Sequence, residues 1–147
     1  MFDANLILLD GSVDLTAATD TPPVSTTVDD TTGARVIDLG ETGAKGITAV
    51  LICVDDVTED DDTLTAFIEC SDTENMTSET NDVHEMGKFD IAAEDKGILL
   101  GSETPCICMV RFSTDKRYVR LNATVGTAPD DFLTVKCYLE PWAFKVL

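Results

Sequence analysis

The strongest pattern in the chain is the alternation of residues 117–125, where every second residue is apolar. Val119, Leu121, Ala123 and Val125 share one side of an extended backbone, and the Tyr, Arg, Asn and Thr between them share the other. A period of two is typical of a β-strand with one face in a core and one face in water. This stretch therefore predicts a half-buried strand.

A strand-like stretch lies on each side of it. Residues 106–112 are apolar at nearly every position, which predicts a strand with two apolar faces, and residues 132–139 alternate again. The inner face of the latter is formed by Leu133, Val135, Cys137 and Leu139. The connections, residues 113–116 and 126–131, are short and rich in turn formers. Three strands with short links predict an antiparallel meander on which the rest of the chain folds.

Further strands are expected upstream, at residues 35–39, 47–54 and 63–70, with weaker candidates at 86–92 and 97–100. The run 47–54 is mostly apolar, which predicts burial on both faces. An inward face in the next strand is formed by Leu64, Ala66, Ile68 and Cys70. No stretch has a helical period, and turn signals recur at regular spacing. These features predict an all-β protein, a single antiparallel β-sandwich.

The rest of the chain is expected to form loops and an arm. Residues 1–33 are interpreted as an N-terminal strand followed by an extended arm or a long loop that crosses the surface, because residues 11–33 are rich in Thr, Asp and Pro. Residues 34–147 are the β-sandwich, and at 147 residues the whole chain suits one domain. Acidic loops are expected at 55–62 and 71–85, and residues 141–147 are a short aromatic tail.

The charge of the chain restricts its partners. It has 28 acidic and 10 basic residues, a formal net charge of −18. Such a chain repels phosphate backbones and anionic lipid surfaces, so we expect no nucleic acid and no membrane among its partners. The acid at position 3 and the short apolar run 6–9 do not fit a signal peptide. The five cysteines, all in strand-like runs, are therefore interpreted as reduced core residues of a protein made in a cytosol.

Several short motifs suggest chemistry, and each has a simpler interpretation. The glycine-rich stretch 40–46 lacks the Lys-Ser or Lys-Thr pair of a phosphate-binding loop, so a tight β-turn is expected. The acidic stretch 55–62 could bind Ca²⁺, but it lacks the glycine of an EF-hand loop. His84 is the single histidine, expected in a surface loop, and Cys106 and Cys108 share one strand face in the core. We therefore expect no catalytic, cofactor-binding or metal site, and no enzyme.

Two arginines are conspicuous in so acidic a chain. Arg120 is expected on the wet face of its strand, and Arg117 at the start of that strand. Each could pair with a carboxylate of its own domain or with one across an interface, where Arg is enriched. We prefer the intramolecular pairing.

Three segments carry a resemblance: the start Phe2-Asp to Leu9, the run Ala34-Arg-Val-Ile-Asp-Leu-Gly40 with the apolar strand after it, and residues 117–126 with 132–139. Together they resemble the jelly-roll cement, or decoration, proteins of tailed-phage capsids, of the Bordetella phage cement protein type. The resemblance implies a jelly-roll-like sandwich bound in many copies outside an icosahedral head, where it stabilises neighbouring major capsid proteins. It also implies a homo-oligomer, dimer or trimer, on the outer surface of a virion assembled in a bacterial cytoplasm.

A second hypothesis belongs to another class of function. A β-sandwich can also be a binding module that holds a carbohydrate or Ca²⁺ through its loops, for host attachment by a phage particle. Sugar binding usually needs exposed aromatic rings for stacking. The chain has one tryptophan, Trp142, and two tyrosines, so this alternative has a narrow basis.

Overall fold

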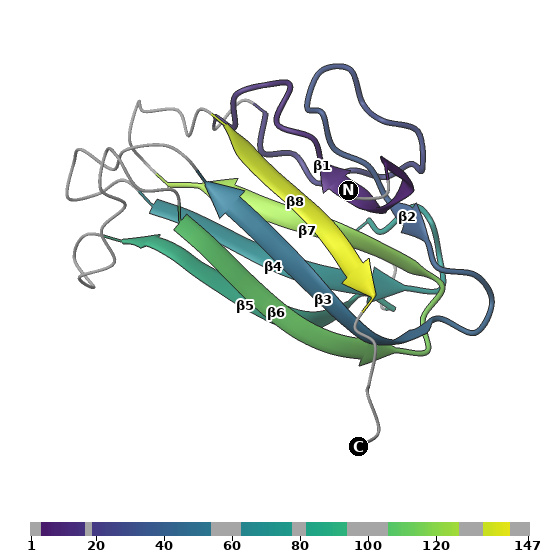
Figure 1. The fold of residues 1–147 in the computed structure, drawn as a ribbon. Coiled ribbons are helices and arrows are strands. Elements are labelled where there is room, and N and C mark those ends of the chain that lie inside the picture. The colour runs from purple at the N-terminus through teal and green to yellow at the C-terminus, as the bar shows by residue number, and fades with distance from the viewer. Residues whose placement is uncertain are drawn as a thin grey trace.

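The computed structural model describes residues 4–16, 19–53, 63–77, 82–93, 106–126 and 134–141, and it is all-β (Figure 1). Within these residues lie a 3₁₀ turn and eight strands: η1 Ala4–Leu6, β1 Ile7–Leu9, β2 Ile37–Asp38, β3 Ala44–Cys53, β4 Thr63–Ser71, β5 His84–Ala93, β6 Cys106–Thr114, β7 Tyr118–Val125 and β8 Val135–Pro141. In the described part, no helix has the length and apolar character to cross a membrane.

The strands form two antiparallel four-stranded sheets. The first sheet has the order β1-β8-β3-β6 and the second has the order β2-β7-β4-β5. The first strand pairs with the last, β2 with β7, β3 with β6 and β4 with β5, as in one long hairpin rolled up on itself. This is the topology of an eight-stranded jelly roll. The prediction of a single antiparallel, jelly-roll-like β-sandwich is confirmed.

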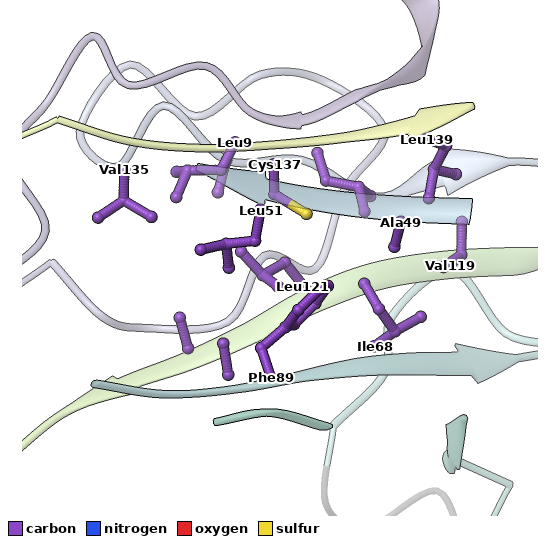
Figure 2. Close-up of a cluster of buried hydrophobic side chains, with 14 of the residues drawn as sticks. Leu9, Ala49, Leu51, Ile68, Phe89, Val119, Leu121, Val135, Cys137 and Leu139 are labelled. Carbon is purple, nitrogen blue, oxygen red and sulfur yellow. The ribbon is translucent and has the colours of Figure 1, made fainter. Parts of the chain in front are cut away.

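The core lies between the two sheets and is filled by alternate residues of the strands (Figure 2). Phe89 of β5 is the largest fully buried side chain, and Leu51 of β3 faces it from the first sheet. The inward residues predicted for β4, β7 and β8 are buried wherever the structure describes them, which confirms the alternation. Removing an apolar side chain of this size from water contributes roughly 1.5–3 kcal/mol.

The predicted meander is wrong. Strand β7 belongs to the second sheet, whereas β6 and β8 belong to the first, where β3 separates them. The short links therefore lead from one sheet to the other instead of joining neighbours. Alternation shows which side chains face a core, but a sandwich has two sheets around the same core. The pattern does not indicate which of them a strand joins.

Residues 10–16 and 19–36 cross one side of the sandwich and bind to both sheets, to β1 through Arg35 and to β7 through Asp20. Strand β2 is only two residues long, so most of the β7 edge is left to this segment. Asp20 accepts a hydrogen bond from the Val125 amide at 3.2 Å, and Leu15 and Pro23 are buried. The expected loop across the surface is present, and it closes the core on that side.

The turn predicted at 40–46 is confirmed for residues 40–43, whereas residues 44–46 already belong to β3. Gly43 donates a backbone hydrogen bond to Gly40 at 3.1 Å and has a φ of +61°. A side chain at Gly43 would also collide with the backbone of Thr114 and Asp115. Glycine is therefore required here on two grounds, backbone conformation and space.

The loop predicted at 71–85 and the start of the strand after it need correction. Residues 71–85 were expected as an exposed loop, but Met76 is buried at 1% exposure, and the strand expected at 86–92 begins at His84. Met76 is unbranched and apolar, so it can fill a gap beside the sheet from a polar loop. The acidic stretch 55–62, the weak strand 97–100 and the tail 142–147 lie outside the described residues.

Candidate interaction surface

The first candidate ligand that the structure places is the single histidine. His84 lies on β5, not in a loop, and its imidazole is exposed, with Nε2 3.5 Å from Asp82 Oδ1. Nowhere in the described ranges do three His, Cys, Asp or Glu side chains gather as metal ligands would. The acidic stretch 55–62 is outside those ranges.

The cysteines lie in strands, as predicted. Cys53, Cys70 and Cys137 are buried, and Cys108 is half-buried against the core. Burial raises the pKa of Cys70 to about 11 and also raises the pKa of Cys137. A thiol with a raised pKa is a poor nucleophile and metal ligand. These residues act as small apolar side chains.

Both arginines pair with carboxylates of their own chain, which confirms that prediction. Arg117 donates two hydrogen bonds to Asp38, at 3.0 and 2.7 Å, and this pair is exposed. The Arg117 guanidinium holds the pKa of Asp38 below its usual range. Arg120 bonds Glu69 at 2.8 Å and is 6% exposed. The expectation that Arg120 lies on a wet face is wrong, because Pro23 covers it and accepts a hydrogen bond from it.

Two of the clefts on the described surface have polar linings. One, of about 540 Å³, is lined by Arg120, Glu69 and Asn122 together with apolar residues that include Val24 and Met76. Among the described residues no aromatic side chain lines it, whereas a typical sugar site offers an aromatic ring for stacking.

The other cleft, of about 630 Å³, lies where β5 begins and β6 ends. Lys45 and Lys116 both line it, and Lys116 is held between Asp72 and Asp82, at 2.6 and 2.9 Å, which keeps the pKa of Lys116 high. An ammonium held by two carboxylates is already neutralised and has little remaining attraction for an anion. The charge pairing favours a structural role for this network.

The outer face of the first sheet has a different character. Its side chains stand in three rows across the strands, set by the pairing of β3 with β6 and β8. The central row is apolar from edge to edge, and its members are Ile7, Tyr138, Val50 and Met109. One flanking row contains Lys136, Ile52 and Ile107, and the other contains Glu140, Thr48 and Arg111.

The apolar part of this face is open to water at β6. Met109 is 65% exposed and Ile107 is 58% exposed, more than any other large apolar side chain in the described ranges. Val50 is only 5% exposed although it points outward, because it stands between Tyr138 and Met109. A contiguous exposed apolar patch with a polar border typically marks a protein–protein contact.

Strand β6 is also the one long edge that lacks protection in the described part. Strand β1 has three residues and an irregular register, and β2 has two residues. Strand β5 is long, but two register shifts and exposed charged residues interrupt it. Strand β6 pairs regularly with β3 from Ile47 to Cys53, and no described strand pairs with its other edge. Natural proteins normally protect such an edge.

The sequence indicated part of this surface. Residues 106–112 were predicted to be apolar on both faces, and they are, but the strand's place at an edge was not predicted. That place depends on strand order, for which the sequence carries no local signal. Ile107 and Met109 are consequently surface residues rather than core residues.

Comparisons of the chain with protein-family models, with curated proteins and with solved structures found no match.

Proposed function

We propose that the protein is a structural decoration protein that binds the outside of a tailed-phage icosahedral capsid in many copies and stabilises neighbouring major capsid proteins. The observation that supports this proposal is the outer face of the first sheet, with Met109 and Ile107 exposed beside the free edge of β6. A rigid sandwich that presents an adhesive sheet face and an unprotected edge is suited to binding other proteins.

The proposal is consistent with the energetics of a shell. A decoration protein acts by contact, so each copy can bind weakly while many symmetric copies together hold the shell. Binding to the assembled shell alone stabilises that shell by mass action. The net charge of −18 would keep free copies apart until a shell organises them. The proposed partners are the major capsid protein and further copies of this chain, at the outer surface of the virion.

The first test is the copy number of the protein in purified particles of its source phage. Quantitative mass spectrometry against the major capsid protein gives this number directly. We expect one copy per capsid subunit or a simple fraction of it. A few dozen copies or fewer would move the protein to a vertex, fibre or tail and favour the host-attachment alternative. Absence from the particle would refute the proposal.

The second test addresses the surface. Shells that lack the protein are mixed with wild type, Met109→Lys or Val28→Lys, and the bound fraction is measured after sedimentation. Val28 is an exposed apolar residue at 38% exposure that lies in a loop, so its exchange is the matched control. We expect the Met109 exchange to reduce binding and the Val28 exchange to leave it unchanged. Equal binding of all three would exclude this face from decoration.

A further inference from the structure

We infer that the outer face of the first sheet packs against the same face of a second copy, related by a two-fold axis. This inference deepens the proposed function, on which its biological setting rests: the outer face joins neighbouring copies on the shell, and Met109→Lys would lower shell binding through the loss of that contact between copies. The association itself is a property of the isolated protein. It follows from the positions of three charges around an apolar centre.

The apolar centre comes first. In the central row, Tyr138 and Met109 flank Val50, and Ile52 and Ile107 adjoin them in the next row. When two such faces meet, these side chains cover one another in the way that two sheets pack in a sandwich, about 10 Å apart. Met109 and Ile107, now 65% and 58% exposed, gain the most from this burial.

The three charges then select the partner. Glu140 stands at one corner of the face, Arg111 lies across β3 from it, and Lys136 lies further along β8. A two-fold axis in the interface and parallel to β3 places Glu140 over Arg111 of the second copy. An axis perpendicular to the strands places Glu140 over Lys136 of the second copy. Neither axis sets like charges opposite each other, so the face is complementary to itself.

The charge of the whole chain also favours this face as the contact between two copies. The face has two basic residues and one acidic residue, whereas the chain has a net charge of −18. Two copies repel each other overall, but the three rows of this face contain more basic than acidic side chains, so the face adds little to that repulsion. Salt screens the long-range repulsion, with a Debye length of about 10 Å at 0.1 M. Added salt should therefore strengthen the dimer, opposite to the behaviour of an interface held mainly by ion pairs.

The small area of the face favours a weak association between the two copies. Four strands about 4.8 Å apart and three rows of side chains cover roughly 20 Å by 20 Å, or about 400 Å² per copy. Stable dimers usually bury about 800 Å² per partner. The isolated protein should accordingly be a weak dimer with a dissociation constant in the range of about 10 µM to 1 mM.

The test is sedimentation equilibrium of the full chain up to about 1 mM, at low salt and at about 0.5 M salt. The wild type is expected to dimerise reversibly, and more strongly at high salt. Met109→Lys should raise the dissociation constant at least tenfold, and Val28→Lys should leave it within about twofold. Both exchanges add one positive charge, so the lower repulsion between copies favours association of both variants equally. A difference between them therefore reports on the face. A wild type that stays monomeric at every salt, or an equal response of the two variants, would overturn the inference.

Charge exchanges identify the face and its axis. Glu140→Lys should weaken a dimer that forms through the sheet face. A dimer that forms through the free edge of β6 should keep its dissociation constant, because β8 lies two strands away from that edge. A second exchange in the Glu140→Lys variant then identifies the axis. If Arg111→Glu restores the dimer, the axis is parallel to β3; if Lys136→Glu restores it, the axis is perpendicular to the strands. Failure of both second exchanges to restore the dimer would refute the two-fold arrangement. The copy number in phage particles is a separate measurement, so the failure of either proposal can be distinguished from that of the other.

Discussion

Arg120 and Glu69 form a salt bridge on adjacent strands of the second sheet, with Nε 2.8 Å from Oε2. Their side chains are only 8% and 15% exposed, because the segment before β2 covers them. Asn122 donates a hydrogen bond to the other oxygen of Glu69 at 2.9 Å. The three side chains connect β7 and β4, and the Pro23 carbonyl ties the loop to them.

Removal of one partner from this buried pair should destabilise the fold strongly. Arg120→Ala leaves the Glu69 carboxylate with Asn122 as its remaining side-chain donor in the described structure. We expect the free energy of unfolding to fall by about 3 kcal/mol, as for other buried pairs that lose one member. Urea denaturation followed by circular dichroism measures it. Arg117→Ala is the control, since its pair with Asp38 is exposed and should contribute far less. Equal losses for both variants would contradict the role of burial.

Gly87 of β5 faces Val110 of β6, and this contact closes the sandwich between the two edge strands. A Cβ at Gly87 would overlap Val110 Cγ1, which has no flexible end that could move aside. Gly87→Ala is expected to cost about 1–3 kcal/mol of stability through overpacking. In the Val110→Ala background the same exchange should cost much less. A double-mutant cycle by denaturant unfolding measures the coupling, and additive effects would show that the two residues do not compete for space.

Glu74 attaches the loop before β2 to the loop after β4. Its carboxylate accepts hydrogen bonds from the Thr26 amide and hydroxyl at 2.8 and 2.9 Å, and the amide bond is the main cause of its lowered pKa. A carboxyl with a lowered pKa in the folded state stabilises the fold above its ordinary pKa near 4.5. This contribution is lost as the pH falls further.

Glu74→Gln should therefore lose less stability than the wild type between about pH 6 and pH 3. Urea midpoints measured across this range give the difference. Glu85→Gln is the matched control, because it removes one acidic charge from the exposed part of β5 and leaves the loop contact intact. If the Glu74 variant and the wild type followed the same pH curve, the Thr26 contact would not contribute.

The buried thiols should be chemically silent in the folded protein. Cys70, with a pKa raised to about 11, and Cys137, fully enclosed between the sheets, should react with iodoacetamide at about pH 8 only when the fold opens. Mass spectrometry of labelled peptides over time gives the rate for each site, and half-buried Cys108 should react faster. Rapid labelling of Cys137 in the absence of denaturant would contradict the packing of β8.

The sequence predicted the local part of the fold well. Alternation in β4 and β7 identified the inward residues, because a strand between core and water leaves that period in its sequence. It did not predict that β6, β7 and β8 alternate between sheets, since strand order depends on contacts between distant residues. Arg120 was placed in water for a similar reason, as the loop that covers it comes from residues far away in the chain.

For the interaction surface, the sequence predicted the apolar residue types but not their exposure. Ile107 and Met109 are apolar residues in a strand, and the same two letters would fit a central strand covered on both faces. Their exposure results from the edge position of β6 together with the width of the sheet. The charges at Glu140, Arg111 and Lys136 come from two strands, and their arrangement around the apolar rows depends on register. Short-range patterns contain no record of that register.

The position of β3 in the first sheet also has a consequence for biosynthesis. Both of its neighbours, β6 and β8, come later in the chain, so the ribosome releases β3 well before either can bind it. During translation this mostly apolar strand waits without a hydrogen-bonding partner and with both faces uncovered. Unpaired apolar strands are prone to aggregation, so we expect β3 to be such a point in the newly made chain until β6 has been synthesised.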